Sequence, residues 1–363
     1  MANDRYLRYD PSIEQPRPGE DEVISKIVAS IERTSMVSVE REGHGIRQQH
    51  ARGVGYLRGE LTVNDDLPDH LRQGLFARPG RYPLIVRYST AFARGDRVRA
   101  PRGMAIKVLG VVGDKALPDD TSANQDFLLV NHVNYFSDAW AYLKAQHNVE
   151  LTQKWPDFVF RGANVAARLA VATANATGID FVPQASKPLA DPGDNILGET
   201  FHSQGAIRFG DHVARLRAVP LSEALRRLTG QPCHDNDHAV SEAVSKYFSQ
   251  NSAEYELRAQ LGTDLTRTPI EDTSIGWPED VSPPLPLGRI SLPAQVANST
   301  ARSDYVDRVL SFDPWRCLAD HRPLGSIMRL RRDAYGTSRR LRQENNPTKP
   351  PPGEPQDLTA LPN

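Results

Sequence analysis

The sequence predicts an α+β fold in which an antiparallel sheet, closing into a barrel, is surrounded by helices. Four segments have strand patterns: residues 52–63, 83–90, 103–112 and 126–131. They are joined by turns rich in Asp, Gly and Pro, with no helical pattern between them. Strands connected without a helical crossover pair antiparallel, and strand patterns return after residue 200, so we expect one closed antiparallel sheet.

The first strand also carries the most informative local pattern. Within residues 52–63, polar and aromatic side chains alternate with leucine and valine, which is typical of a half-buried strand. His50 stands where this strand begins, and Gly53 and Gly55 follow it. Small residues beside a strand histidine allow a flat, bulky group to approach the backbone.

The remaining elements alternate between helical and strand patterns. Residues 21–33 place their apolar side chains on one helical face, and residues 157–176 form an alanine-rich helical stretch. Ser137 is expected to cap the helix that opens at residue 136. Further strands are expected at 206–209, 213–216, 255–261 and 288–292, helical or mixed segments at 221–228 and 239–251, and a helix at 300–310.

The chain is expected to have three parts. Residues 1–34 form an N-terminal arm and helix, and residues 35–343 form one domain, because composition does not change within them. Residues 344–363 are rich in proline and are expected to be disordered.

Composition excludes several classes of function. The chain has 363 residues with 44 Lys+Arg and 45 Asp+Glu, a net charge of −1 that, taken over the whole chain, gives no electrostatic basis for binding nucleic acid or an anionic membrane. Two cysteines, Cys233 and Cys317, do not make a disulfide framework. We find neither a signal-peptide core nor a run long enough to span a membrane, and expect a cytoplasmic protein.

Four motifs occur in a fixed order around these strands. They are RQQHARG at residues 47–53, VRYST at 86–90, PRGMAIK at 101–107 and NQDFLLV at 124–130. Together they resemble the core of the catalase family, and the resemblance extends over residues 40–343. It implies an antiparallel β-barrel with surrounding helices that enclose haem. One such motif would be weak evidence, whereas four in order are a specific signal.

The resemblance also implies how haem b and its iron would be held. Tyr335, in the segment RRDAY, matches the axial tyrosine ligand of the iron, and Arg331 lies one helical turn before it. A neighbouring guanidinium favours the phenolate form. Arg47, Arg87 and Arg342 match the three arginines that bind the haem propionates. No Cys-x-x-Cys-His signal is present, so we expect non-covalent haem. Without the upstream motifs, Tyr335 would be interpreted as an ordinary tyrosine that packs a basic surface helix against the core.

Further residues match the peroxide side of a catalase site. His50 matches the distal histidine, which moves a proton between the two peroxide oxygens and leaves a ferryl intermediate. Asn124 matches the asparagine that holds the peroxide, and Ser89 the residue that orients the imidazole. Phe136 matches the ring that packs on the porphyrin, although an ordinary core phenylalanine is nearly as well supported.

The sequence also departs from full-size catalases. Gln49 stands where catalases have a valine, and from the resemblance we expect a protein without the long flanking regions. We therefore expect a hydroperoxidase for hydrogen peroxide or organic peroxides, active in oxidative stress, with peroxidase action on a small organic donor favoured over dismutation. A homodimer is expected rather than the intertwined tetramer of large catalases. Two alternatives stay open: an allene-oxide-synthase-like lyase or peroxygenase acting on a fatty-acid hydroperoxide, and a non-catalytic haem-binding protein.

Overall fold

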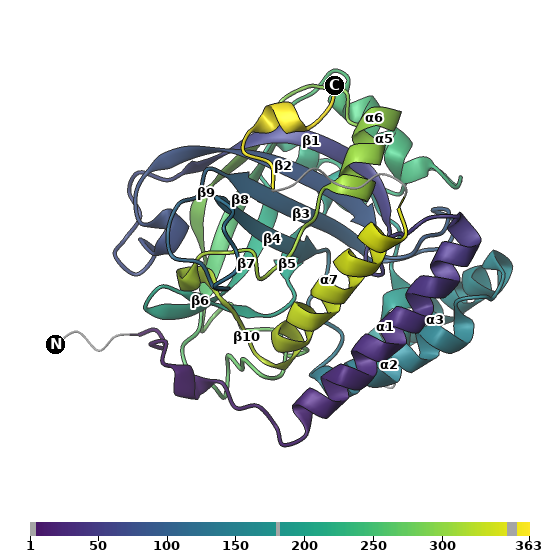
Figure 1. Ribbon diagram of the computed structural model, residues 1–363, viewed down its shortest axis with the longest axis horizontal. Helices are drawn as coiled ribbons and strands as arrows, with labels where there is room; N and C mark the ends of the chain where they lie inside the picture. Colours follow the sequence, from purple (N-terminus) through teal and green to yellow (C-terminus); the bar gives the residue numbers. More distant parts are fainter. Residues whose placement is uncertain (1–4, 179–181, 347–353) are drawn as a thin grey trace.

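The computed structural model describes residues 5–178, 182–346 and 354–363, and its centre is an antiparallel sheet (Figure 1). Within the described residues 52–130, no α-helix separates the first four of its ten strands, as the sequence predicts, and each predicted strand is present. They are β1 (Arg52–Val63), β2 (Gly80–Thr90), β3 (Arg102–Leu109), β4 (Asn124–Val130), β5 (Phe201–Ser203), β6 (Ala206–Phe209), β7 (His212–Pro220), β8 (Ala253–Leu261), β9 (Pro284–Leu292) and β10 (Pro323–Leu324).

The sheet closes into a barrel, which confirms the predicted fold class. Neighbouring strands run in the order β10-β6-β7-β5-β4-β3-β2-β1-β9-β8, and an additional pairing of β7 with β8 joins the two ends. Closure leaves β6 and β10 attached to the outer edge of β7. A closed sheet has no long unpaired edge, so its backbone groups are satisfied within the barrel.

Strand alternation divides the barrel into an apolar interior and a functional exterior. On β2 and β3, Val86, Tyr88 and Ile106 belong to the main hydrophobic core. Arg87 and Ser89, which alternate with Val86 and Tyr88 along β2, therefore point to the opposite face of the sheet, because successive side chains alternate. The outer face of β2–β4 thus carries polar groups that a solvated or ligand-binding surface requires.

Helices cover this outer face. Figure 1 shows α7 between the barrel and α1, and α1 also packs on α2. Isoleucines of α1, including Ile27 and Ile31, share an apolar cluster with Ile327 and Leu330 of α7. The helices are α1 (Glu20–Glu42), α2 (Ala139–Thr152), α3 (Asp157–Thr177), α4 (Glu223–Arg226), α5 (Ala239–Phe248), α6 (Thr300–Asp304) and α7 (Ser326–Glu344). In the described part of the chain, no helix is both long and apolar enough to cross a bilayer.

Two local predictions about helices differ from the structure. The cap of α2 is Asp138, whose carboxylate accepts a hydrogen bond from the amide of Ala141, and not Ser137. The segment predicted as one helix over 300–310 is divided into α6 and a π-helical turn, Tyr305–Val309. Such π-turns are frequent at functional sites, and this one carries Asp307, which binds two arginines that line the cavity described below.

The predicted boundaries also change at both ends. Helix α1 runs continuously across the predicted boundary at residue 34, so the N-terminal helix is part of the helical layer. Residues 354–363 of the tail are ordered: Leu361 is fully buried, and Arg302 donates to the Pro362 carbonyl at 2.8 Å. The tail was expected to be disordered because of its prolines. Its residues 347–353, like residues 1–4 of the arm, lie outside the described residues.

Candidate functional site

A large cavity lies between the outer face of β2–β4 and the helices α1, α2 and α7. Its volume is about 570 Å³, within the range of about 300–1,000 Å³ that is typical of small-molecule and cofactor sites. Strand alternation explains its lining, because Arg87 and Ser89 of β2, Gly103 of β3 and Val130 of β4 all come from the outer face.

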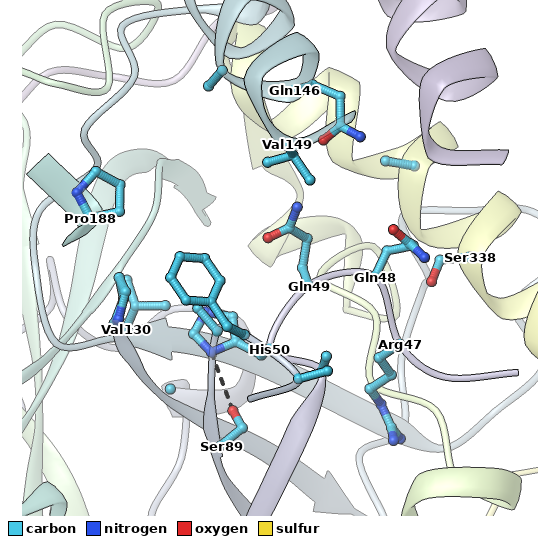
Figure 2. A pocket seen from close by; sticks show the side chains of 18 of the residues that line it. Arg47, Gln48, Gln49, His50, Ser89, Val130, Gln146, Val149, Pro188 and Ser338 are labelled. Carbon is cyan, nitrogen blue, oxygen red and sulfur yellow. Dashed lines mark hydrogen bonds between the residues drawn. The ribbon is translucent and has the colours of Figure 1, made fainter. Parts of the chain in front are cut away.

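His50 stands at the barrel side of this cavity, where Figure 2 shows it beside Ser89. The Ser89 hydroxyl lies 3.3 Å from His50 Nδ1, and Arg87 Nη1 donates to the His50 carbonyl at 3.0 Å. A Cβ added to Gly103 would lie 2.5 Å from His50 Nδ1, so a glycine is required there. Three neighbours on two strands thus fix the imidazole.

Burial keeps the His50 ring neutral. Desolvation, followed by the charge of Arg87, lowers the pKa of His50 to about 3. The backbone of His50 is also unusual, because its φ is 50°, in the left-handed region that residues other than glycine rarely adopt. Such local strain is often found at functional sites, where surrounding contacts maintain it.

Tyr335 faces the same cavity from α7. Arg331, one turn earlier on the helix, donates from Nη2 to the Tyr335 hydroxyl at 2.8 Å, and its guanidinium lies 5.0 Å from the ring centre. A cationic hydrogen-bond donor stabilises negative charge on a phenol oxygen. Tyr335 and Arg331, which the sequence places one helical turn apart, are therefore in contact at the cavity wall.

Three arginines from distant parts of the chain converge beside this tyrosine. Arg47 Nη1 and Arg87 Nε both donate to Asp307 Oδ1, at 2.8 and 3.1 Å, and Arg342 Nη2 donates to the Leu310 carbonyl at 3.1 Å. Burial and then the charges of Arg342 and Arg87 lower the pKa of Arg47. The three guanidinium groups are therefore close enough to repel one another.

Asp307 is the carboxylate at the centre of this arginine cluster, and sequence analysis did not find it. It lies on the π-helical turn, and the Tyr56 hydroxyl donates to its Oδ2 at 2.5 Å. Burial would raise the pKa of Asp307, but the charges of Arg87 and Arg47 outweigh burial and lower it. One carboxylate cannot balance three guanidinium groups, and Arg342 Nε is buried without a hydrogen-bond partner among the described residues. An anionic ligand would supply the negative charge and the hydrogen-bond acceptor that the cluster lacks.

The opposite wall of the cavity is aromatic and amide-rich. Gln49 Nε2 donates to the Tyr142 hydroxyl at 2.6 Å, and in Figure 2 the Gln49 side chain points toward Gln146 and Val149 of α2. Phe136 lines the cavity with its ring edge-on to Tyr142, at a centroid distance of 5.4 Å. The residue that replaces the expected valine therefore forms a polar contact across the cavity.

Asn124 is the predicted site residue that the structure places elsewhere. It opens β4 opposite Leu109, whereas Val130 at the other end of the strand pairs with Gly103 beside His50. Six residues of extended strand separate the two positions by about 20 Å. The Asn124 amide donates instead to the Pro355 carbonyl of the tail at 3.1 Å. Asn124 therefore does not line the cavity, and its assignment to peroxide binding is corrected.

His132 lines the cavity instead, just after β4 ends. Its Nδ1 lies 2.6 Å from the Val133 carbonyl, and its ring stacks on Tyr135 at a centroid distance of 3.8 Å. Burial lowers the pKa of His132 to about 4, and its charge contributes to the low pKa of His50. The sequence signal was available: a histidine two residues beyond a strand of the motif set.

Comparisons with known proteins agree on one family of relatives. No protein-family model matches the chain. Two curated proteins, catalase isozymes 2 and 3 of Cucurbita pepo, are each 24% identical to it over 319 residues, which cover 85% of this chain and 62% of theirs. The chain thus spans less than two thirds of the length of these relatives.

Solved structures show the same architecture. Catalase A from Saccharomyces cerevisiae matches with a TM-score of 0.58 and 18% identity, over 94% of this chain and 68% of that one. A bacterial catalase matches with a TM-score of 0.56 and 15% identity, over 94% of this chain and 64% of its own. The barrel, its helical layer and the sequence relationship lead to one conclusion: this chain is related to catalases and has the fold of the catalase core.

Proposed function

We propose that this chain is a haem-dependent hydroperoxidase that reduces hydrogen peroxide or organic peroxides with a small organic donor. One observation carries the proposal. A neutral histidine, His50, and an arginine-bonded tyrosine, Tyr335, face the same cavity, and a cluster of excess positive charge lies beside them. Storage of a cofactor needs no proton-transferring histidine, so this combination favours an enzyme over a haem carrier.

The residues present fit haem b. Tyr335 would hold the haem iron through its phenol oxygen, and Arg331 would stabilise the phenolate form. Arg47, Arg87 and Arg342 would bind the two propionates, which offset the positive charge that Asp307 leaves unbalanced.

The proton chemistry belongs to the chain's own residues. When bound, the haem iron supplies the redox chemistry that peroxide cleavage requires. His50 accepts a proton from one peroxide oxygen and returns it to the other, which leaves as water or an alcohol. A pKa of about 3 keeps His50 in the proton-accepting form at neutral pH. His132 places a second neutral imidazole in the cavity, where it can hydrogen-bond the substrate in the role first assigned to Asn124.

The cavity wall favours peroxidase action over dismutation. The Gln49–Tyr142 contact puts polar groups where an apolar neck would favour hydrogen peroxide alone. A second candidate function, rearrangement or oxygen transfer with a fatty-acid hydroperoxide, has one observation in its favour. Val149, Trp155 and Val159 give the α2–α3 end of the cavity an apolar lining suited to an acyl chain.

The test begins with haem binding. Purified protein titrated with haemin should give a high-spin ferric spectrum with tyrosinate charge-transfer bands. Tyr335→Phe should remove these bands, whereas Tyr82→Phe on β2, outside the cavity, should keep them. An unchanged spectrum in Tyr335→Phe would contradict the assignment of Tyr335 as the ligand of the haem iron.

Steady-state assays then separate the activities. Hydrogen peroxide, tert-butyl hydroperoxide and a fatty-acid hydroperoxide are each supplied with and without an organic donor. Donor-dependent turnover of the first two supports the hydroperoxidase. Donor-independent conversion of the fatty-acid hydroperoxide supports the second candidate. Haem binding without turnover of any peroxide would support the non-catalytic alternative.

A further inference from the structure

Helix α3 is apolar on both of its faces. Its inner face carries Ala167 and Ala174, which are buried, and on its outer face Phe158, Val165 and Leu169 are 71%, 63% and 68% exposed. These three residues are seven and four positions apart and therefore share one side of the helix. A surface helix ordinarily exposes polar residues on that side.

The exposed apolar surface continues into the segment that joins α2 to α3. Leu151 is 61% and Trp155 49% exposed, and together with Phe158, Val165 and Leu169 they form what we call the α3 patch. Other exposed large apolar residues, such as Val112, Leu265 and Val296, are isolated in the sequence and need no explanation. Grouped apolar exposure of this kind marks an interaction surface.

The position of the patch is well anchored. Asn164, on the inner face of α3, donates to the carbonyls of Arg99 and Leu189 at 3.0 and 2.7 Å. Arg94 donates to the Gln153 and Trp155 carbonyls at 2.9 and 3.0 Å. The apolar side chains are therefore presented outward by a fixed scaffold.

The basic residues beside the α3 patch indicate which kind of partner it binds. Lys154, Arg161 and Arg168 are exposed within the same segment, and Arg161 and Arg168 are seven residues apart along one edge of the apolar face. Asp157, the acidic residue between Lys154 and Arg161, is already paired with Arg94. Tryptophan and phenylalanine on an apolar face with basic residues at its edge are typical of helices that lie in a membrane interface, where cations attract anionic headgroups.

A second copy of the chain fits the patch less well. Pairing about a twofold axis through α3 would bring the basic edges of two copies together, because each copy contributes the same surface. Anionic lipid complements both the apolar face and its charge.

The patch also adjoins the cavity. Trp155 belongs to both, and Val159, Phe160 and Ala163 line the cavity from the inner side of α3. We propose that the α3 patch docks on anionic phospholipid membranes and places the mouth of the cavity against the lipid. Docking stands on the patch alone, whereas delivery of a lipid peroxide from the membrane to the cavity rests on the proposed function.

Vesicle co-sedimentation tests the docking. The full chain is mixed with vesicles of phosphatidylcholine alone or with added phosphatidylglycerol. We expect binding to the anionic vesicles and weaker binding at high salt. The double variant Phe158→Ser, Leu169→Ser should lower the partition coefficient at least tenfold. Arg161→Gln and Arg168→Gln should each lower it roughly fivefold.

Matched variants away from the patch serve as controls. Val296→Ser removes an apolar residue that is 58% exposed, and Arg226→Gln removes an exposed arginine of α4. Both should bind vesicles like the wild type, with unchanged circular dichroism in all variants. Failure of the wild type to bind anionic vesicles would overturn the proposal. So would a dimer, seen by light scattering, that Phe158→Ser, Leu169→Ser converts to a monomer, because a second copy would then cover the patch.

The two proposals fail separately. His50→Ala leaves the α3 patch intact and should bind vesicles like the wild type even when peroxide turnover is lost. Vesicle binding without peroxide turnover in the wild type would contradict the proposed function and leave docking supported. Turnover of lipid peroxide in detergent, without vesicle binding, would contradict docking alone.

Discussion

His50 is the residue on which the proposed chemistry depends most directly. Its ring is held by Ser89, its carbonyl by Arg87, and the missing side chain of Gly103 makes room for it. The contacts around it must also maintain a positive φ, which an imidazole-bearing residue adopts at some energetic cost. This preorganisation suits a group that must receive a proton without moving.

Replacement of His50 by alanine should therefore separate binding from chemistry. We expect haem occupancy close to that of the wild type, and a loss of about a hundred- to ten-thousand-fold in the rate of reaction with peroxide. Stopped-flow absorbance measures this rate, and His147→Ala on the exposed side of α2 is the control. An unimpaired rate in His50→Ala would exclude the histidine from the mechanism.

The pH profile of the same rate is a second test of the role of His50. His50 acts in its neutral form, and its pKa is lowered to about 3, so its contribution should be constant from about pH 5 to 8 and fall only as the pH approaches 3. A midpoint near the ordinary histidine value of about 6.5 would show that the ring is solvated in the working protein.

Gln49 is the residue expected to set the balance between dismutation of hydrogen peroxide and oxidation of an organic donor. Gln49→Val removes the hydrogen bond to the Tyr142 hydroxyl and replaces an amide with an apolar side chain. Oxygen evolution from hydrogen peroxide should then rise relative to donor oxidation, and the ratio of the two initial rates measures the change. A constant ratio would mean that this position does not control the choice, and would strengthen the fatty-acid hydroperoxide alternative.

At the scale of elements, the arginine cluster shows how separate segments make one site. Arg47 precedes β1, Arg87 lies on β2, Arg342 ends α7, and Asp307 sits on the π-helical turn. Each segment contributes one charged group to the cluster. Packing of α7 and the turn against the barrel gives the cluster its excess positive charge, which is costly unless a ligand offsets it.

This arrangement predicts opposite effects on the free and the haem-bound protein. Arg342→Gln removes one of the repelling charges, so the melting temperature of the haem-free protein should stay constant or rise. Its haem affinity should fall at least tenfold, because a charged hydrogen bond contributes about 1.5–3 kcal/mol. Haemin titration and thermal unfolding measure the two effects, with Arg340→Gln on the exposed side of α7 as the control. Equal affinity in Arg342→Gln would refute the propionate assignment.

At the scale of the whole molecule, the C-terminal tail closes over the barrel. Glu354 lies 3.2 Å from Lys107 Nζ and 2.7 Å from Arg316 Nη2, and both bases also contact Asp126. Two bases and two acids balance in this buried network. Leu361 then packs in an apolar cluster on the barrel exterior. The tail is therefore a structural part of the domain.

Glu354→Gln should consequently destabilise the fold. The substitution leaves Lys107 and Arg316 with one carboxylate between them, and breaking a buried ion pair costs on the order of 3 kcal/mol. Urea unfolding measures the loss, and Asp119→Asn in an exposed turn is the matched control. A loss no greater than that of the control would mean that the tail does not contribute to stability.

Local sequence patterns determined much of this molecule. Strand patterns predicted β1 to β4 and helical periodicity predicted α1, because both periods reflect backbone geometry within a single element, and alanine-rich composition predicted α3. The fold class is confirmed. His50, Ser89, Arg87 and Tyr335 were found by short motifs, and the structure brings them to one cavity; their roles stay predictions.

Tertiary structure decided what depends on distance between elements. Closure through β7 and β8 is a long-range pairing, and which face of the barrel the helices cover is settled only by packing. Asn124 and His132 lie close together in the sequence, yet a strand of about 3.3 Å per residue carries one away from the cavity and ends beside the other. Asp307 and the ordered tail were missed for the same reason: their partners lie far away in the chain, and no local pattern records a contact that only the folded chain makes.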